Sequence, residues 1–335
     1  MSNHEIRQSD PVEEDGLVFA IRLRGDGTGE LVGWGEVEAW TVGDPPLWIH
    51  LDRANTRAQS WLRKQSGLTE PTAEALLTEE TRPRVFFGKR GTVAVLRGLN
   101  LNIGQETEDM IAVRIWSEGQ RVISLRDIRL QSVRDVLTTL IDLGTGPKTI
   151  TELFVGLIAR INVRIAPTIN LYEEKIDQIE ERVSEVDTRT TRKTLADVRR
   201  NAVLVRRYLS PQRVALTDLI TEPPEWASEA WRPSLRETSD RVVRFVEALD
   251  TVKERALVIK DDIYNDIAES TNRTLYVLAM ISAVFLPLSF LTGLLGINIG
   301  GMPGVDSENA FWVFCAIMGM LLAAEIAVFK YLKWI

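Results

Sequence analysis

Gly296-Ile297-Asn298 is the tripeptide of this chain whose residue types and position are best suited to chemistry. It closes an uncharged stretch, so the amide oxygen of Asn298 would stand at the mouth of an apolar segment. A ring of such oxygens from several copies can hydrogen-bond the water shell of a cation without holding the cation too tightly to release it. Gly296 lets the backbone leave a helix at this point. The same residues also make an ordinary helix terminus, which the local sequence alone favours.

Two apolar segments frame the loop that follows this tripeptide. Residues 274–295 carry no charge, and about 22 residues are enough to cross a bilayer as a helix. Residues 311–329 come after a short outer loop, 299–310, and contain a single charge, Glu325. We therefore expect a membrane hairpin, in which residues 274–298 form the first transmembrane helix together with the tripeptide.

One side of the first apolar segment gathers small, hydroxyl-bearing and glycine residues at steps of alternately four and three. This stripe consists of Leu275, Ala279, Ser282, Leu286, Ser289, Gly293 and Gly296. A pore lining would use the hydroxyl groups, and rings of leucine would constrict it and gate it by dewetting. Close helix contact explains the small residues too, and it suffices for Gly293. Pro287 predicts a kink, with a gating hinge as the alternative.

Carboxylates near the two ends of this helix are candidates for attracting cations. The stripe continues backward through Asn272, Ala268, Asn265 and Asp261. Asp261 would therefore face the same axis as the stripe. In the outer loop, Asp306 and Glu308 would concentrate cations if several copies met around that axis. Ordinary solvated charges are the alternative for both loop residues.

Glu325 is the one carboxylate inside the second apolar segment. An intramembrane carboxylate is by default a functional candidate, here a proton carrier. Glu325 lies five residues before Lys330. Pairing with Lys330, or extension to the cytoplasmic interface, is the interpretation that the sequence favours.

The distribution of charge predicts the topology. The net charge of −7 and the 26% of charged residues describe an acidic soluble chain. Residues 1–16 form a polar tail without the apolar core of a secretory signal. Arg273, Lys330 and Lys333 flank the apolar segments, whereas the connecting loop has no Lys or Arg. The positive-inside rule then places both termini in the cytoplasm and the loop outside.

Metal-ligating and catalytic side chains are scarce. Cys315 is the only cysteine, and the two histidines, His4 and His50, are far apart in sequence, so a tetrahedral zinc site of the usual spacing is absent. A transported zinc ion would move hydrated or held by oxygen atoms. The run 25–29 is glycine-rich but lacks the Lys-Ser/Thr of a phosphate-binding loop. We therefore expect no enzyme and no cofactor.

The remaining chain predicts an N-terminal α/β domain followed by long helices. Strands are expected at 17–23, 47–51, 92–97, 110–116 and 121–125. Helices are expected at 57–64, 73–79, 150–160, 161–184 and 192–209, with Pro211 in the first turn of another helix. Residues 235–286 contain neither glycine nor proline, so a single helix of about 78 Å would run from the domain into the membrane. A break near Ser270-Thr271-Asn272 is the alternative.

The Gly-x-Asn exit from the first of two C-terminal helices resembles the CorA superfamily of divalent-cation transporters. The segment 291–304 is similar to the zinc-transporting ZntB branch of that superfamily, as are Trp48–Asp52, Thr81–Arg84 and the stretch from Met110 to Arg126. The resemblance extends from about residue 17 to residue 335. It implies an α+β membrane protein that forms a homopentamer in a bacterial inner membrane.

The resemblance also implies an order of domains. A cytoplasmic α/β domain would occupy 17–150 and a helical funnel or stalk 151–273. The two transmembrane helices and their outer loop would follow, and residues 330–335 would form a cytoplasmic tail.

The resemblance further implies roles for single residues. Gly296, Ile297 and Asn298 would form the selectivity filter, Asn272 and the stripe would line the pore, and Asn298 and Asp261 would meet the hydrated ion. Zinc transport, passive or proton-coupled, is the expected function. Ile297 replaces the methionine of magnesium-transporting relatives, which puts magnesium in doubt. A CorA-type magnesium, cobalt or nickel channel and a membrane-tethered sensor or scaffold are the alternatives.

Overall fold

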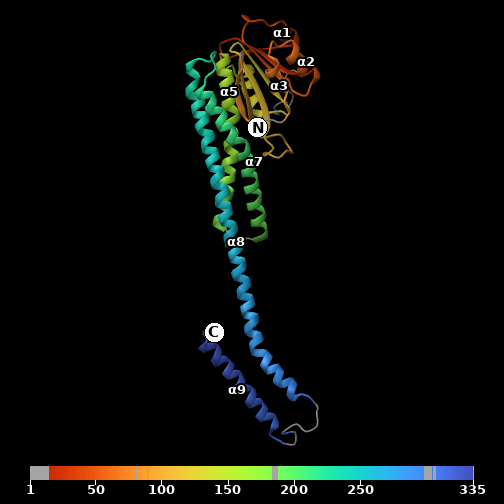
Figure 1. Cartoon of the computed structure of the whole chain (residues 1–335), viewed down its shortest axis with the longest axis vertical. Coiled ribbons are helices and arrows are strands. Elements are labelled where there is room, and N and C mark those ends of the chain that lie inside the picture. Colours follow the sequence, from red (N-terminus) through yellow and green to blue (C-terminus); the bar gives the residue numbers. More distant parts are fainter. Residues whose placement is uncertain are drawn as a thin grey trace, which may run out of the picture. The chain divides into compact units, whose positions relative to one another are not determined.

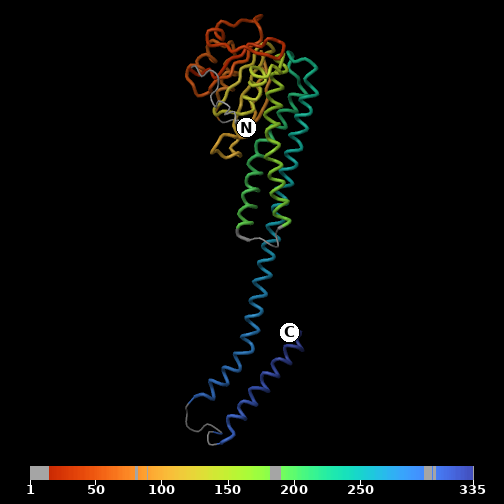
Figure 2. Tube along the Cα trace, turned by 180° about the vertical axis from the view of Figure 1, so that it is seen from behind, coloured from red at the N-terminus to blue at the C-terminus, as the bar shows by residue number. Residues whose placement is uncertain are grey.

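The structure is a computed structural model that describes residues 15–79, 82–88, 90–182, 188–297, 304 and 307–334. Its contacts divide the chain into two compact units, Met1–Lys260 and Asp261–Ile335, called here the first and the second unit. Figures 1 and 2 trace the chain from red at the N-terminus to blue at the C-terminus.

A seven-stranded sheet forms the centre of the first unit. The strands lie in the order β2-β1-β3-β7-β6-β5-β4, and β3 and β7 are the one parallel pair of neighbours in this sheet. The strands are β1 Leu17–Leu23, β2 Gly29–Val32, β3 Leu47–Asp52, β4 Arg84–Gly88, β5 Gly91–Gly98, β6 Ile111–Ser117 and β7 Arg121–Arg126. The five strands expected from the sequence are confirmed. The sequence does not predict β2 and β4, which are the two edge strands and are only partly buried.

Side chains of the strands alternate between two buried layers, one on each face of the sheet. In β3, Trp48 belongs to one layer, and Leu47, Ile49 and Leu51 belong to the other. The layer that contains Leu47 is covered by α1 Trp34–Ala39, α2 Thr56–Lys64 and α3 Glu70–Leu77. The layer that contains Trp48 is covered by α4 Gln131–Ile141, α5 Ile150–Val163, η1 Glu229–Trp231 and parts of α7 Thr188–Thr221 and α8 Arg232–Leu295 (Figure 1). The sequence predicts α2, α3 and α5 but not α1 or α4.

Three further helices are α6 Ala166–Arg182, α7 Thr188–Thr221 and α8 Arg232–Leu295, of which the first unit includes α8 as far as Lys260. The sequence expectation for Pro211 is wrong, because this residue lies inside α7 instead of opening a new helix. A proline removes one backbone donor and strains the preceding turn. The helix continues because the residues after Pro211 pack into the core: Gln212, Ala215, Leu216 and Leu219 are all buried.

Gln212 ties α7 to the sheet and to α5. Its side-chain oxygen accepts a hydrogen bond of 2.8 Å from the backbone N–H of Arg97 at the end of β5. Its amide nitrogen donates to Asn162 Oδ1 at 2.8 Å, and Asn162 in turn donates to the carbonyl of Ile158 at 2.8 Å. Gln212 and Asn162 are both fully buried, so the polar atoms of these two side chains bond protein partners instead of water.

Ion pairs connect α8 to α6 and α7 within the first unit. Arg255 of α8 bonds Asp177 at 2.7 Å and Glu180 at 2.5 Å. Arg206 of α7 lies 2.7 Å from Asp250 of α8. The hydrogen bond from Arg255 holds the pKa of Glu180 below its ordinary value, and the one from Arg206 does the same for the pKa of Asp250.

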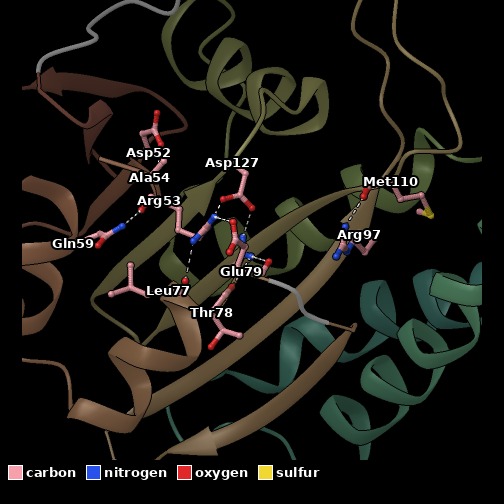
Figure 3. A network of polar contacts seen from close by, with 11 residues as sticks. Asp52, Arg53, Ala54, Gln59, Leu77, Thr78, Glu79, Arg97, Met110 and Asp127 are labelled. Atoms are coloured by element: carbon pink, nitrogen blue, oxygen red, sulfur yellow. Dashed lines mark hydrogen bonds and ion pairs between the residues drawn. The ribbon is translucent and has the colours of Figure 1, made fainter. Parts of the chain in front are cut away.

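A network of polar contacts fixes the end of α3 against the sheet (Figure 3). Arg114 of β6 has no exposed side-chain surface, and its Nη1 donates to Asp127 Oδ2 at 2.9 Å. Its Nη2 donates to the carbonyls of Thr78 and Glu79 at 2.8 and 2.9 Å. Arg53 donates to Asp127 as well and to the carbonyl of Leu77. Burial lowers the pKa of Arg114, and Asp127 opposes that shift by favouring the charged guanidinium.

The second unit contains the rest of α8 and the helix α9 Ala310–Tyr331. Helix α8 has no break at Ser270-Thr271-Asn272, as the uninterrupted run of helix-forming residues predicts. Both helices are long and apolar enough to cross a membrane. The hydroxyl of Tyr276 donates to the carbonyl of Trp334, and the rings of Phe329 and Trp334 stack with 5.8 Å between centroids. The start of the apolar part of α8 and the end of α9 are therefore side by side.

Candidate ion pathway

The stripe predicted from the sequence is exposed along its whole length in the single chain. Leu275 is 57% exposed and Leu286 is 74% exposed. The remaining members of the stripe, together with Asn272, are in the same exposed class: Ala279, Ser282, Ser289, Gly293 and Gly296. No residue of the second unit that the structure describes covers this side of α8.

A different side of α8 is turned toward α9. In the apolar part of α8 the less exposed residues are Met280, Ala283, Val284, Pro287, Leu288 and Leu291. On α9 they are Ala310, Phe314, Met318, Leu321, Glu325 and Phe329. Each set follows a helical repeat, so it marks the contact face of one helix with the other. We call the contact between these two faces the seam.

The seam and the stripe lie on nearly opposite sides of α8. A helix turns 100° per residue, which places the centre of the stripe well over a third of a turn from the centre of the seam. One face of α8 is therefore used inside the hairpin, and the face with Ser282 and Ser289 is left for contacts outside the chain.

The hydroxyl of Ser282 is oriented by the helix itself. It donates to the carbonyl of Leu278 at 2.9 Å, so its hydrogen is used and its lone pairs remain. Water molecules around a cation point their hydrogens outward. The oxygen of Ser282 can therefore accept from such a water shell, which is the role a hydrated-ion pathway requires.

Helix α8 ends at Leu295, directly before the tripeptide. The N–H of Gly296 still bonds the carbonyl of Thr292 at 2.9 Å. A Cβ atom added to Gly296 would lie 2.9 Å from that same carbonyl oxygen, closer than side chains come, so glycine is required by the chain's own backbone. Around Gly293, in contrast, nothing lies within 4 Å of an added Cβ.

The structure describes only some of the other residues proposed for the filter and for attracting cations. Ile297 is described and 45% exposed. Asn298 and the loop residue Asp306 lie outside the described residues. Glu308 is exposed, two residues before α9 begins. Asp261 is exposed on α8, at the start of the second unit.

The expected pairing of Glu325 with Lys330 is not found. Both carboxylate oxygens of Glu325 are buried, and neither has a hydrogen-bond partner among the described residues. Lys330 is exposed. Five residues along a helix correspond to a rotation of about 140°, so the two side chains leave α9 on different sides. The sequence could have predicted that Glu325 lies on the same helical face as Phe314, Met318 and Leu321, because these residues are spaced by four and three positions.

Metal ligands of the usual type are not clustered in the described part of the chain, where no group of three His, Cys, Asp or Glu side chains is placed to hold an ion. His50 is buried in β3, and its Nδ1 lies 2.8 Å from the hydroxyl of Ser124. This histidine belongs to the core of the first unit.

Comparison with known proteins identifies the family. The sequence matches the family described as CorA-like Mg2+ transporter protein over residues 44–331. The chain belongs to the CorA family. One relative, the divalent cation transporter CmaX of Pseudomonas aeruginosa, is 38% identical over 96% of this chain and 98% of its own length. Another, the zinc transport protein ZntB of Pectobacterium atrosepticum, is 31% identical over 97% of this chain and 98% of its own length.

A solved structure supports the same assignment. The structure of full-length CmaX superposes with a TM-score of 0.84 at 36% identity and covers 97% of this chain and all of that one. The CorA family consists of divalent-cation transporters and not of enzymes. The sequence predictions of the family, of divalent-cation transport and of a non-enzyme are confirmed.

Proposed function

We propose that this chain carries divalent cations, zinc among them, across a bacterial inner membrane through a pore enclosed by several copies. The exposed polar stripe of α8 carries this proposal. Two helices cannot enclose a pore, and the face of α8 with Ser282 and Ser289 is turned away from α9. Other copies would bring equivalent faces together around an axis, with Asn272 and Asp261 continuing the path at the cytoplasmic end.

Five copies are the number that the resemblance to CorA implies. The boundaries of the domains at residues 150 and 273 and the homopentamer stay predictions. Mass determination of the intact protein in mild detergent should give about five subunits. A stable monomer would remove the basis of the pore.

The filter is assigned to Gly296, Ile297 and Asn298. Its support is the end of α8 at Leu295 and the requirement for glycine at position 296. A ring of Asn298 amides would replace part of the outer interactions of a hydrated ion without stripping its inner shell. Asp306 and Glu308 would raise the local cation concentration, an effect that added salt weakens.

Zinc is proposed as the preferred cargo because of Ile297 and the similarity to a protein named for zinc transport. The other relative is named only for divalent cations, and the family description names Mg2+. Magnesium, cobalt and nickel are therefore the competing ions. Transport would be either passive or driven by a pH gradient across the membrane, so flux with and without such a gradient has to be compared.

Flux measurements in liposomes test the function and the filter together. Purified protein should move zinc faster than magnesium, cobalt or nickel, with and without a pH gradient. Asn298→Ala should abolish flux while the assembly persists. Asn309→Ala is the matched control, because Asn309 precedes α9 and makes no side-chain capping bond there. Equal flux from wild type and Asn298→Ala would reduce the tripeptide to a helix terminus.

The topology is proposed with both termini in the cytoplasm, from the positions of Arg273, Lys330 and Lys333. A membrane-impermeant thiol reagent added outside should label Glu308→Cys and should not label Ser234→Cys, with Cys315 replaced by serine in both variants. Labelling of Ser234→Cys alone would invert the proposed orientation.

A further inference from the structure

Glu325 occupies an unusual position in the membrane hairpin. Its side chain lies in the seam between α9 and α8, in line with Phe314, Met318, Leu321 and Phe329. Both of its carboxylate oxygens are buried, and neither has a hydrogen-bond partner among the described residues. The cation pathway proposed above does not use this residue, because the stripe lies on the other side of α8.

No opposite charge of the described chain faces Glu325. Helix α8 has no Asp, Glu, Lys, Arg or His between Thr274 and Leu295. Its one titratable side chain there is Tyr276, whose hydroxyl donates to the carbonyl of Trp334. On α9 itself, Lys330 and Tyr331 are exposed, and so is Cys315. These groups leave the helix on other sides or at other depths.

A buried carboxylate without a counter-charge is costly, and such groups become neutral instead of remaining ionised. We propose that Glu325 is a proton-binding site inside the membrane hairpin. A hydronium ion transfers one proton to the carboxylate, so one O–H bond of the hydronium ion breaks, one O–H bond of the acid forms, and a water molecule is left; release of the proton to water reverses this step. The neutral acid is then compatible with the apolar seam.

The seam also offers the acid an acceptor. Pro287 has no N–H, so the carbonyl of Ala283, four residues earlier, loses its helical donor. Counted from the contact of Tyr276 with Trp334, the antiparallel helices bring Glu325 to about the level of Ala283 and Val284. The neutral acid supplies one O–H donor at that level, and the ionised carboxylate supplies none. Proton binding would therefore join the two helices, and proton release would separate them.

Infrared spectroscopy of the full-length protein in liposomes tests this proposal without any transport assay. A neutral carboxylic acid has a C=O stretching band that a carboxylate lacks. At neutral pH the wild type should show such a band, and Glu325→Gln should lack it. Glu308→Gln, which changes an exposed carboxylate next to the same helix, should retain it. A band pattern that is the same in wild type and Glu325→Gln would overturn the proposal.

Two further variants keep the test decisive if Glu325→Gln assembles poorly. Glu325→Asp should shift the band without removing it. Pro287→Ala restores a backbone donor to the carbonyl of Ala283, so it should shift the band of Glu325 as well. A band unaffected by both variants would show that the acid lies elsewhere in the chain.

The consequence for transport rests on the proposed function. If the pH gradient drives flux in the wild type, Glu325→Gln should lose the response to the gradient and keep the residual flux. An acid band in a wild-type protein that moves no cation would leave the proton site intact and refute the proposed function alone.

Discussion

The two units of this chain differ in where their apolar side chains go. In the first unit they pack on both faces of a sheet and between α6, α7 and α8. In the second unit, Phe329 is the one buried hydrophobic residue after Ile263 among those described, and Leu286 and Trp312 are more than 70% exposed. The first unit can therefore fold on the contacts of one chain. The second exposes apolar side chains that lipid and the other copies of the proposed assembly would cover.

The same contrast appears in the polar residues. In the first unit, the buried amides of Asn162 and Gln212 and the Nη atoms of Arg114 bond partners from the unit's own strands and helices, although Arg114 Nε has no hydrogen-bond partner among the described residues. The second unit leaves its stripe of small and hydroxyl-bearing residues exposed and a carboxylate unpartnered in the seam. The proposed assembly would cover the exposed stripe, and the proposed proton on Glu325 would make the seam neutral.

The largest effect on flux should come from substituting the glycines of the stripe. Comparing Gly296 with Gly293 distinguishes a glycine that the backbone of one chain requires from one that this backbone does not require. Gly296→Ala should abolish flux, because its Cβ would meet the carbonyl of Thr292 at 2.9 Å and the strain, about 1–3 kcal/mol, falls on the filter backbone. Gly293→Ala fits the single chain, so any effect on flux should come from the pore lining or from contacts between copies. Liposome flux and detergent mass together check this. Equal flux from wild type and Gly296→Ala would refute the claim that the chain itself requires this glycine.

The next effect should be on the stability of the first unit. Asp127→Asn leaves the buried guanidinium of Arg114 without its carboxylate, which should cost about 3–5 kcal/mol of unfolding free energy. Asp218→Asn is the control, since Asp218 is exposed and no ion pair of this residue occurs within the described part of the chain. Urea unfolding of the detergent-solubilised protein, followed by tryptophan fluorescence, measures the difference. A loss as small as that of the control would mean that the network in Figure 3 contributes little.

The smallest effect should come from the ion pairs between helices. The pKa of Glu180 and that of Asp250 are lowered in the folded chain, so their stabilisation is present above the ordinary carboxyl values and is lost as the pH falls through the lowered ones. Arg255→Gln should therefore lower the thermal midpoint at neutral pH and cease to do so in acid. These groups are largely exposed, and each pair is worth about 1 kcal/mol or less. Arg199→Gln should show no such pH dependence.

Much of the first unit follows from local patterns in the sequence. The five central strands are runs of apolar and β-branched residues, and the sequence predicts them to within one or two residues. The edge strands β2 and β4 lack that pattern because they are only partly buried. The continuation of α7 through Pro211 depends on buried contacts of Gln212 and Leu216, which are tertiary and have no counterpart in the local sequence.

In the second unit the sequence singles out the stripe of α8, which is exposed in the single chain, but it does not predict which faces of α8 and α9 meet. The stripe follows from spacing alone, because a helix repeats every 3.6 residues. The burial of Glu325 in the seam could not be predicted without knowing where α9 lies relative to α8. The same spacing rule, applied from Phe314 to Phe329, would have separated Glu325 from Lys330.

Cysteine accessibility tests most directly whether the stripe of α8 is the ion pathway. Ser282→Cys and Ile281→Cys, each with Cys315→Ser, place a thiol at the same depth on two different faces of α8. A water-soluble thiol reagent should block divalent-cation flux through Ser282→Cys in liposomes and leave Ile281→Cys unaffected, because water reaches the pore and not the lipid. Block of Ile281→Cys alone, or of neither variant, would contradict the assignment of the stripe to the pore.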